Sequence, residues 1–451
     1  MPPEEKFDVI IVGAGVAGIT AALVCARAGL ETVVFERGEY PGAKNLSGGV
    51  LFGSVIQGLI PNYWEKAPVE RAVSRKEFAF LSNEKSLSFE FSTQAFAQPP
   101  YNNTFAVLRS KFDRWYAEQA EEAGAMFVTE TVVDDLIKED GRVVGVKSRR
   151  DEGDMYADCV IIAEGASSFL AERMGLHNPF GPMDMVTTAK EVLSLPQGVI
   201  EDRFNLEPGE GVSIDCFGEG AAMGMLGGGF VYTNKDSLSV GIGVNVGDVM
   251  RTRVSPNNLL ERFKSHRSIR RLLKDAKLEE YSAHLIPEYG QGRFFPRCGD
   301  GWMIVGDAAG FVNTSLYHEG TNYACASGLA AAQTVIEAKA NGDFSAASLK
   351  AYDKRLEESL VMQDLRRFKD VAEFMHKHPE FLGKYPETII ELAERYFEVT
   401  GEPKEKILKR VVRGFRSGLP LMKMSLDSLA MMQKVLGVEP KWFFFPGKED
   451  K

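Results

Sequence analysis

The chain has only five cysteines, and their spacing fits no metal site. Cys25, Cys159, Cys216, Cys298 and Cys325 are scattered, with no CxxC pair, and the six histidines show no metal-ligand spacing either. Zinc and iron–sulfur sites draw on closely spaced Cys or His pairs, and dithiol redox enzymes use CxxC. The sequence therefore predicts no metal site, and the cysteines are interpreted as small apolar residues in a reducing compartment.

The chain also lacks a basic stripe and a long apolar run. Lys and Arg number 53 against 63 Asp and Glu, for a net charge of -10, so no nucleic-acid partner is expected. No apolar run approaches the roughly 20 residues that cross a bilayer. The opening MPPEEKFDVII is acidic and leaves no room for a signal peptide. A cytoplasmic location is predicted, and contact with the inner face of the cell membrane stays open.

Glycine, by contrast, is abundant, and several glycines form a motif near the start of the chain. Residues 7–36 read FDVIIVGAGVAGITAALVCARAGLETVVFE, a strand, a GxGxxG turn, an Ala-rich helix and a second strand that ends on Glu36. Gly13 permits the tight turn, Gly15 lets a pyrophosphate approach the backbone, and Gly18 lets helix and strand pack closely. Glu36 would accept hydrogen bonds from the ribose hydroxyls. This βαβ unit predicts dinucleotide binding.

A second strand-to-turn segment, VGDAAGFVNTSLYHEG at 305–320, bears on which dinucleotide is bound. A strand-like run ends there at Asp307, among small residues. If this turn reaches the flavin half of a cofactor whose adenosine half lies at residues 13–36, two distant segments hold one long molecule, and FAD is predicted. The alternative is that Asp307 caps the next helix.

No second GxGxxG follows a strand and opens a helix. The run GEGAAMGMLGGG at 218–229 lies between alternating, sheet-like segments and is discounted as a nicotinamide site. Together with the missing CxxC pair, this argues against a pyridine-nucleotide disulfide oxidoreductase. Electrons are therefore expected to arrive from another protein.

The periodicity along the chain predicts an α/β protein whose FAD-binding domain is discontinuous. Residues 1–168 form its first part, and they include an antiparallel meander before a buried strand at 159–163. Residues 169–297, with short alternating runs between Gly-rich turns, form a substrate or quinone lobe with an antiparallel sheet. Residues 298–345 return to the FAD-binding domain, and residues 346–451 form a C-terminal helical region.

Three motifs together resemble one superfamily. GAGVAG with Glu36, CVIIAEGASS at 159–168 and GWMIVGDAAGFVN at 301–313 are similar to the glutathione-reductase-like FAD proteins, in their geranylgeranyl-reductase and electron-transfer-flavoprotein:quinone oxidoreductase branch. Two further segments, PGAKNLSGGVLFG at 41–53 and AHLIPEYGQG at 283–292, look like signatures of the FixC-type subunit.

The resemblance implies a glutathione-reductase-like Rossmann FAD domain and a set of partners. The alpha and beta subunits of an electron-transfer flavoprotein and a small ferredoxin-like iron–sulfur subunit would feed electrons to FAD, which would reduce a membrane quinone. The fused relatives carry an iron–sulfur domain at the C-terminus. This chain ends in KWFFFPGKEDK without cluster cysteines, so a separate iron–sulfur polypeptide is expected.

Motif and resemblance together define the candidate site. Arg109 is expected at the FAD phosphates, with a solvated charge at a helix start as the alternative, and Lys44 is either a positive charge near the flavin or an ordinary exposed lysine. A helix that begins near Gly320 would point its N-terminus at the flavin ring. The predicted cofactor-binding residues are Gly13, Gly15, Ala17, Gly18, Glu36, Arg37, Lys44, Ser47, Gly48, Gly49, Arg109, Val133, Ala163, Glu164, Gly165, Gly306, Asp307, Gly320, Thr321 and Asn322.

Quinone protonation is assigned to Tyr317 and His318, which precede the helix facing the flavin; a structural role for His318 is the alternative. The Met- and Phe-rich residues 420–445 would form either a membrane or partner surface or a helix packed on the core. Two other functions stay open. One is a geranylgeranyl-type reductase of isoprenoid lipids, and the other is a flavin-bearing scaffold subunit without its own turnover.

Overall fold

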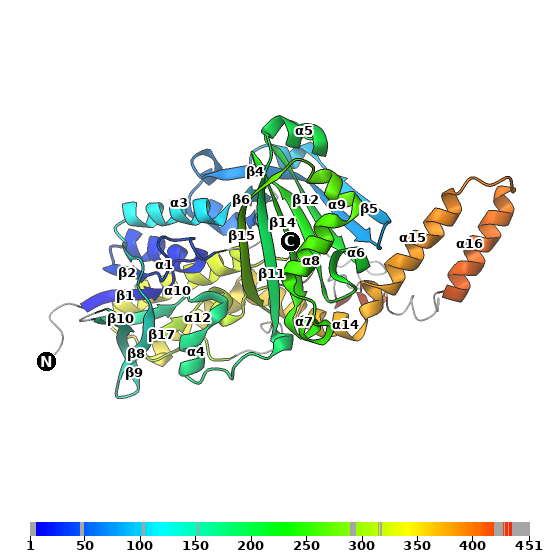
Figure 1. The fold of residues 1–451 in the computed structure, drawn as a ribbon. Helices are drawn as coiled ribbons and strands as arrows, with labels where there is room; N and C mark the ends of the chain where they lie inside the picture. Colours follow the sequence, from blue (N-terminus) through cyan, green and yellow to red (C-terminus); the bar gives the residue numbers. More distant parts are fainter. Residues whose placement is uncertain are drawn as a thin grey trace, which may run out of the picture.

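The computed structural model describes residues 6–45, 49–101, 104–150, 153–288, 295–313, 315, 318–418, 427, 429–431 and 433–434. Two sheets divide this part of the chain, as Figure 1 shows. The first, sheet A, carries the N-terminal βαβ unit, and the second, sheet B, stands beside it. The predicted combination of a Rossmann-type FAD domain with a second, mainly antiparallel sheet and C-terminal helices is confirmed.

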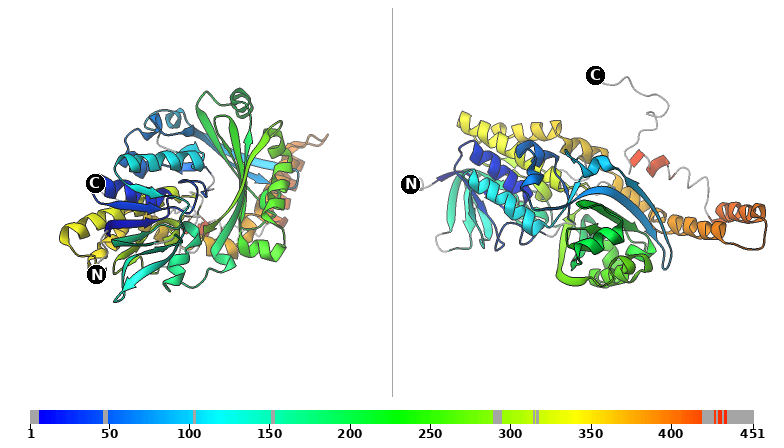
Figure 2. Two further views of the ribbon diagram at one scale, coloured as in Figure 1. Left: turned by 60° about the vertical axis from the view of Figure 1, so that its left-hand side comes forward. Right: turned by 90° about the horizontal axis from the view of Figure 1, so that it is seen from above.

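Sheet A is built around parallel strands, as the apolar runs in the sequence predict. β1 pairs in parallel with β2 and β10, and β10 pairs in parallel with β17. Helices α1, α3 and α10 lie together beside this sheet (Figure 2). The strands of sheet A are β1 (Lys6–Val12), β2 (Thr32–Phe35), β7 (Met126–Val128), β8 (Val133–Glu139), β9 (Arg142–Ser148), β10 (Asp154–Ile162), β16 (Cys298–Gly299) and β17 (Trp302–Ile304).

The helices beside sheet A are α1 (Val16–Arg27), α2 (Ser54–Leu59), α3 (Arg109–Glu122), α4 (Phe169–Arg173) and α10 (Thr321–Asn341). The small residues of α10 permit close packing against α1, as their sequence predicts. A Cβ added at Gly328 would overlap the carbonyl oxygen of Ala17. The meander of β8, β9 and β10 is also confirmed, because β8–β9 and β9–β10 pair antiparallel.

Sheet B has the order β15-β11-β14-β13-β12-β4-β6-β3, with β5 against β4. Its strands are β3 (Val50–Phe52), β4 (Val69–Leu81), β5 (Ser86–Ser92), β6 (Thr104–Val107), β11 (Met185–Ser194), β12 (Glu210–Phe217), β13 (Gly227–Thr233), β14 (Ser237–Asn245) and β15 (Lys277–Pro287). The structure therefore places residues 50–107 largely in sheet B, whereas the sequence-based boundaries left them in the FAD-binding domain. Sequence patterns do not show that β4 pairs with β12, in parallel, across more than 130 residues.

One face of sheet B carries helices and the other faces sheet A. α8 (Pro256–Ser265) buries Leu259, Leu260 and Phe263 against the helix-covered face. Because side chains alternate along a strand, the residues between those facing α8 point toward sheet A. The other helices beside sheet B are α5 (Gln197–Phe204), α6 (Glu219–Ala222), α7 (Val246–Thr252) and α9 (Arg267–Leu272).

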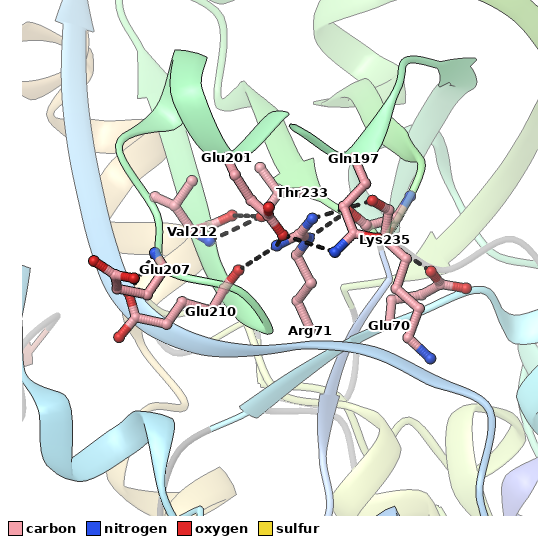
Figure 3. A network of polar contacts seen from close by, with 10 residues as sticks. Glu70, Arg71, Gln197, Glu201, Glu207, Glu210, Val212, Thr233 and Lys235 are labelled. Carbon is pink, nitrogen blue, oxygen red and sulfur yellow. Dashed lines mark hydrogen bonds and ion pairs between the residues drawn. The ribbon is translucent and has the colours of Figure 1, made fainter. Parts of the chain in front are cut away.

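A buried arginine joins β4 to the rest of sheet B, as seen close by in Figure 3. Arg71 donates through Nε to the carbonyl of Asn234 at 2.7 Å, and through its terminal nitrogens to those of Glu210 at 3.0 Å and Lys235 at 3.1 Å. Its side chain also forms an ion pair with Glu201 at 3.1 Å. The turn after β13 and the start of β12 are thereby fixed against β4.

The C-terminal region is helical, as predicted from its periodicity. Its helices are α11 (Ala346–Leu349), α12 (Ala351–Glu358), α13 (Leu360–Arg367), α14 (Val371–Lys377), α15 (Lys384–Phe397) and α16 (Lys404–Gly418). α15 and α16 form a hairpin that projects from the body of the molecule (Figures 1 and 2).

Candidate active site

The glycine turn after β1 has the geometry that its motif predicts. Gly13 has φ +107°, and a Cβ there would overlap the carbonyl oxygen of Ala163. A Cβ at Gly18 would overlap the carbonyl oxygen of Gly13. Gly15 differs, because its Cβ would face a cavity, with the Nδ2 of Asn45 as its nearest neighbour at 3.9 Å. Gly13 and Gly18 therefore serve packing, while Gly15 leaves room for a ligand.

Glu36 lies at the end of β2 and is 9% exposed. One carboxylate oxygen accepts a hydrogen bond from the backbone N–H of Ala14 at 2.9 Å, and the other accepts from that of Gly38 at 2.6 Å. Both bonds hold the carboxylate at the cavity wall beside Arg37 and Ala17. The glycine turn and the residues after β2 thus fix the position of the Glu36 carboxylate.

Asp307 lines the same cavity, just after β17, in a short 3-10 turn, η6 (Gly306–Ala309). Burial raises the pKa of its carboxyl to about 6, and the nearby Arg109 opposes that rise. The alternative in which Asp307 caps the next helix is wrong, because α10 begins 14 residues later, after Gly320, without a side-chain cap. Gly306, also at the cavity, donates its N–H to Ser327 Oγ at 2.9 Å.

Two helix N-termini open on this cavity. Neither α1, after Gly15, nor α10, after Gly320, has a side-chain cap or an acid in its first turn. Thr321 lines the cavity, and its Oγ1 is buried with no hydrogen-bond partner in the described part of the chain. Free N–H groups and a helix dipole at each end favour an anionic or electron-rich ligand.

Asn322 does not line the cavity, in contrast to the prediction for it. Its Oδ1 accepts hydrogen bonds from Ser54 Oγ at 3.0 Å and from the N–H of Val55 at 3.1 Å, and its Nδ2 donates to Glu319 at 2.9 Å. The side chain therefore fixes the start of α2 against α10. A sequence shows that a residue begins a helix but not toward which side it turns.

Arg109 lines the cavity at the start of α3 and is 8% exposed. The alternative of a solvated charge is therefore wrong. Its guanidinium makes two hydrogen bonds to Asp113, at 2.6 and 2.7 Å. Asp113 also accepts from the side-chain amide of Asn45, and a Cβ at Gly42 would lie 2.8 Å from the Arg109 carbonyl oxygen. The loop at 41–45 and α3 thus form one unit, with Lys44 exposed beside the cavity.

The remaining predicted cofactor residues have different surroundings. Val133, Ala163 and Gly165 line the cavity. Glu164 also lines it, but its carboxylate accepts hydrogen bonds from the N–H groups of Leu170 and Ala171 at the start of α4. Gly49 packs against β6, where a Cβ would lie 2.9 Å from the Val107 carbonyl oxygen. Ser47, Gly48 and Tyr317 lie outside the described residues.

The wall formed by sheet B presents ionisable side chains that the sequence did not single out. Five of them lie on β4, β11, β12, β13 and β15, in that order, and the sixth follows β15. They are Lys76, Lys190, Asp215, Tyr232, His284 and Glu288. Burial raises the pKa of Glu288 to about 7 and lowers that of Lys190 to about 8. Side chains alternate between the two faces of a strand. The only sequence signal for these residues is therefore a charged or polar side chain at every second position of an otherwise apolar strand.

His318 also faces this wall from the segment before α10. Its side chain is accessible within the cavity, yet enough protein surrounds it that burial lowers its pKa, while the negative charge of Asp215 opposes that shift. Asp215 accepts a hydrogen bond from the hydroxyl of Tyr232 at 3.2 Å, and burial raises its pKa. His318, predicted from sequence, is thus electrostatically coupled to Asp215 and Lys76, which were not predicted.

The residues described above as lining the cavity border one space of about 1250 Å³. Most ligand sites occupy roughly 300–1,000 Å³, so this space suits a long ligand, or a ligand and a second molecule. Away from Glu36 the lining becomes apolar, with Phe78, Phe80, Phe217, Leu226, Val371, Met375, Phe381, Leu382 and Met431.

Comparison with known proteins agrees with this geometry. Two models described as FAD dependent oxidoreductase match residues 8–170 and 101–334, and the ETF-QO/FixC family C-terminal domain matches residues 371–436. Protein FixC of Bradyrhizobium diazoefficiens is 40% identical over 91% of this chain and 95% of its own length. The probable electron transfer flavoprotein-quinone oxidoreductase YdiS of Escherichia coli is 39% identical over 94% of this chain and 98% of its own.

The chain belongs to the FixC/ETF-QO family of FAD-dependent oxidoreductases. Solved structures show the same fold at lower identity. A geranylgeranyl bacteriochlorophyll reductase-like protein from Thermoplasma acidophilum has a TM-score of 0.70 at 23% identity, covering 92% of this chain and all of its own. The flavin-dependent brominase Bmp2 has a TM-score of 0.63 at 18% identity, covering 92% of this chain and all of its own.

FAD is the cofactor of this FixC/ETF-QO family member, and the cavity fits it. Gly15 leaves open space at a helix N-terminus, where a pyrophosphate binds well, and the uncapped start of α10 at Gly320 and Thr321 borders the same cavity. Within the residues that the structure describes, no group of His, Cys, Asp and Glu side chains is arranged to hold a metal ion. Nor does any described helix have the length and apolarity needed to span a membrane.

Proposed function

We propose that this chain accepts electrons from an electron-transfer flavoprotein and delivers them to a quinone, in a complex that also contains a small ferredoxin-like iron–sulfur subunit. The observation that carries the proposal is the apolar end of the cavity. Val371, Met375, Phe381, Leu382 and Met431 line it, and all five lie in the segment that matches the ETF-QO/FixC C-terminal domain. An apolar head group and tail would be accommodated there.

In this proposal the sheet A wall holds FAD. Gly13, Gly15 and Gly18 shape the turn at the pyrophosphate, Glu36 accepts the ribose hydroxyls, and Asp307 meets the flavin half of the cofactor. When bound, FAD supplies the transfer of one or two electrons. The chain itself orients the cofactor, excludes water and supplies the polar groups around it.

The sheet B wall would serve the substrate. Reduction of a quinone to a quinol takes up two electrons and two protons, so a buried site needs groups that hold protons. Asp215, hydrogen-bonded to Tyr232 and electrostatically coupled to His318, has that chemistry at the cavity wall. The domain assignment follows: residues 169–297 with β3–β6 form the substrate lobe, and the helical region from 346 forms the apolar entrance, at a peripheral membrane location.

The test follows electrons through the FAD-loaded protein under anaerobic conditions. Its flavin is reduced by a reduced electron-transfer flavoprotein, and a short-chain ubiquinone or menaquinone analogue is then added while flavin absorbance is recorded. We expect reoxidation by quinone within the time of a turnover. Reoxidation by a polyprenyl lipid alone would instead identify an isoprenoid-lipid reductase, and reoxidation by neither would leave the scaffold role.

A matched pair of variants locates the quinone. Met375→Glu places a charge in the apolar end of the cavity, and we expect the KM for quinone to rise about tenfold or more. Met250→Glu makes the same change at a methionine on α7 that is 63% exposed, and it should leave the KM unchanged. An unchanged KM in both variants would place quinone elsewhere.

A further inference from the structure

Lys190 is a buried cation that projects into the cavity from the middle of β11. It is 4% exposed, and it lines the cavity together with Thr188. The next residue, Glu191, points to the opposite face, where its carboxylate pairs with Lys264 on α8 at 2.7 Å. Because side chains alternate along a strand, Lys190 points to the cavity and Glu191 points away from it, where its charge is already neutralised.

No hydrogen bond or ion pair joins the Lys190 ammonium to any residue in the described ranges. On β15, Glu280 attracts it from a distance, while Arg109 on α3 repels it. His284 on β15 also lines the cavity, and on the other neighbouring strand, β14, the paired residue is Gly241. A buried ammonium without a close partner is costly, so this position favours a negatively charged ligand in the cavity.

We propose that Lys190 is the countercharge for the negative charge that bound FAD gains on reduction. Uptake of two electrons and one proton, from a reduced flavoprotein or from dithionite, adds one net negative charge to the flavin. The phosphates of FAD are accounted for on the sheet A wall, by Gly15 and the start of α1. Lys190 lines the opposite wall of the same cavity, and in this proposal it lies against the flavin half of the cofactor.

This inference rests on FAD as the cofactor and not on the identity of the electron acceptor. It also predicts that Lys190 acts on the reduced cofactor more than on the oxidised one. Stabilising the reduced form raises the flavin midpoint potential. A lysine that only neutralised the phosphates would strengthen the binding of oxidised and reduced FAD equally. The midpoint potential would then be unchanged.

The experiment compares Lys190→Met, which keeps an unbranched side chain of similar size and removes its charge, with Lys190→Arg. Lys147→Met, at an exposed lysine on β9, gives the same change of net charge and serves as the control. Midpoint potentials are measured by anaerobic dithionite titration against a reference dye, and FAD affinity by flavin fluorescence on the apoprotein.

We expect Lys190→Met to lower the affinity for reduced relative to oxidised FAD about tenfold, which for two electrons is a fall of about 30 mV. Lys190→Arg and Lys147→Met should stay near the wild-type potential. An unchanged potential in Lys190→Met overturns the proposal, whether FAD affinity falls with it or not, since a fall in affinity alone would identify a phosphate contact.

A second measurement covers the case in which Lys190→Met does not retain FAD. The wild-type holoprotein is produced with ¹³C-labelled lysine, and the Lys190 signal is identified by its absence in Lys190→Arg. We expect its pKa to be higher in the reduced than in the oxidised protein. Equal pKa values in both states would contradict the proposal.

Discussion

The two walls of the cavity differ in the chemical groups that they present to a ligand. On the sheet A side, the surface at the nucleotide turn is mostly backbone, with two uncapped helix N-termini and one acid held by two N–H groups, and Arg109 and Asp307 add charged side chains. On the sheet B side, it consists of charged and aromatic side chains from separate strands. A backbone surface suits a cofactor of fixed shape, whereas a side-chain surface can be changed residue by residue. Cofactor binding and electrochemical tuning should therefore be separable by mutation.

The sharpest test of that separation is a large residue at Gly15. Because a Cβ there faces open space, Gly15→Arg should fold normally, but its side chain fills the pyrophosphate position. We expect FAD affinity to fall about 1,000-fold, equivalent to about 4 kcal/mol, with little change in the melting temperature of the apoprotein. Gly58→Arg, at a glycine with no neighbour within 4 Å of its Cβ, is the control. Full FAD loading of Gly15→Arg would show that the cofactor does not use this turn.

Arg71 tests the scaffold of the sheet B wall without touching the cavity. Arg71→Met removes the donor to three backbone carbonyls and leaves Glu201 without its partner. We expect the free energy of unfolding to fall by about 3 kcal/mol, measured by urea denaturation, while FAD affinity at 20 °C stays close to wild type. Arg251→Met, at an arginine that is 68% exposed, should change stability by less than about 1 kcal/mol. Equal stabilities would mean that the network is redundant.

Asp307 should make the stability of the apoprotein depend on pH. Its pKa is raised by burial from an ordinary 3.8 to about 6, so the folded state binds the proton more tightly than the unfolded state. Its contribution to stability is therefore fully present below about pH 4 and is lost as the pH rises through 6. Asp307→Asn does not titrate, so its stability relative to wild type should rise by about 2 kcal/mol between pH 4 and pH 6. Thermal unfolding across this range measures the difference, and a constant difference would contradict the raised pKa.

The smallest effect is expected at Glu36. Glu36→Gln retains the shape of the side chain but replaces one acceptor oxygen with an amide that faces the N–H of Ala14 or Gly38. We expect about tenfold weaker FAD binding by fluorescence titration, since one charge-assisted contact is lost. Glu31→Gln, at an exposed acid one residue before β2, should bind FAD as the wild type does. A larger loss than in Gly15→Arg would reverse the order of importance on this wall.

The cofactor wall could be predicted from sequence because its parts are local. Gly13, Gly15, Gly18 and Glu36 lie within one βαβ unit, and the geometry of that unit follows from its residue types. Asp307 was found through its strand-to-turn setting, and it reaches the cavity because β17 pairs with β10 beside β1. Asn322 shows the limit, since its rotation about α10 turned the side chain to α2.

The sheet B wall could not be predicted in the same way. Lys190 and Asp215 are ordinary charged residues within strands, and their proposed roles depend on which face each strand buries. That choice follows from the pairing of β4 with β12 and from the docking of α8, contacts between residues far apart in the chain. The resemblance to FixC-type proteins supplied the quinone hypothesis but no residue on this wall.

By itself, the sequence determined the βαβ unit, the glycine turn with its acid, the absence of metal-ligand spacing and the helical C-terminal region, because each depends on neighbouring residues. Only the tertiary structure decided that strands β3–β6 join sheet B, that Asp113 engages Arg109, and that Lys190 projects into the cavity without a hydrogen-bond or ion-pair partner among the described residues. The physical reason is that burial and charge compensation depend on contacts across the chain, and a strand's residues acquire an inside and an outside only when the sheets pack.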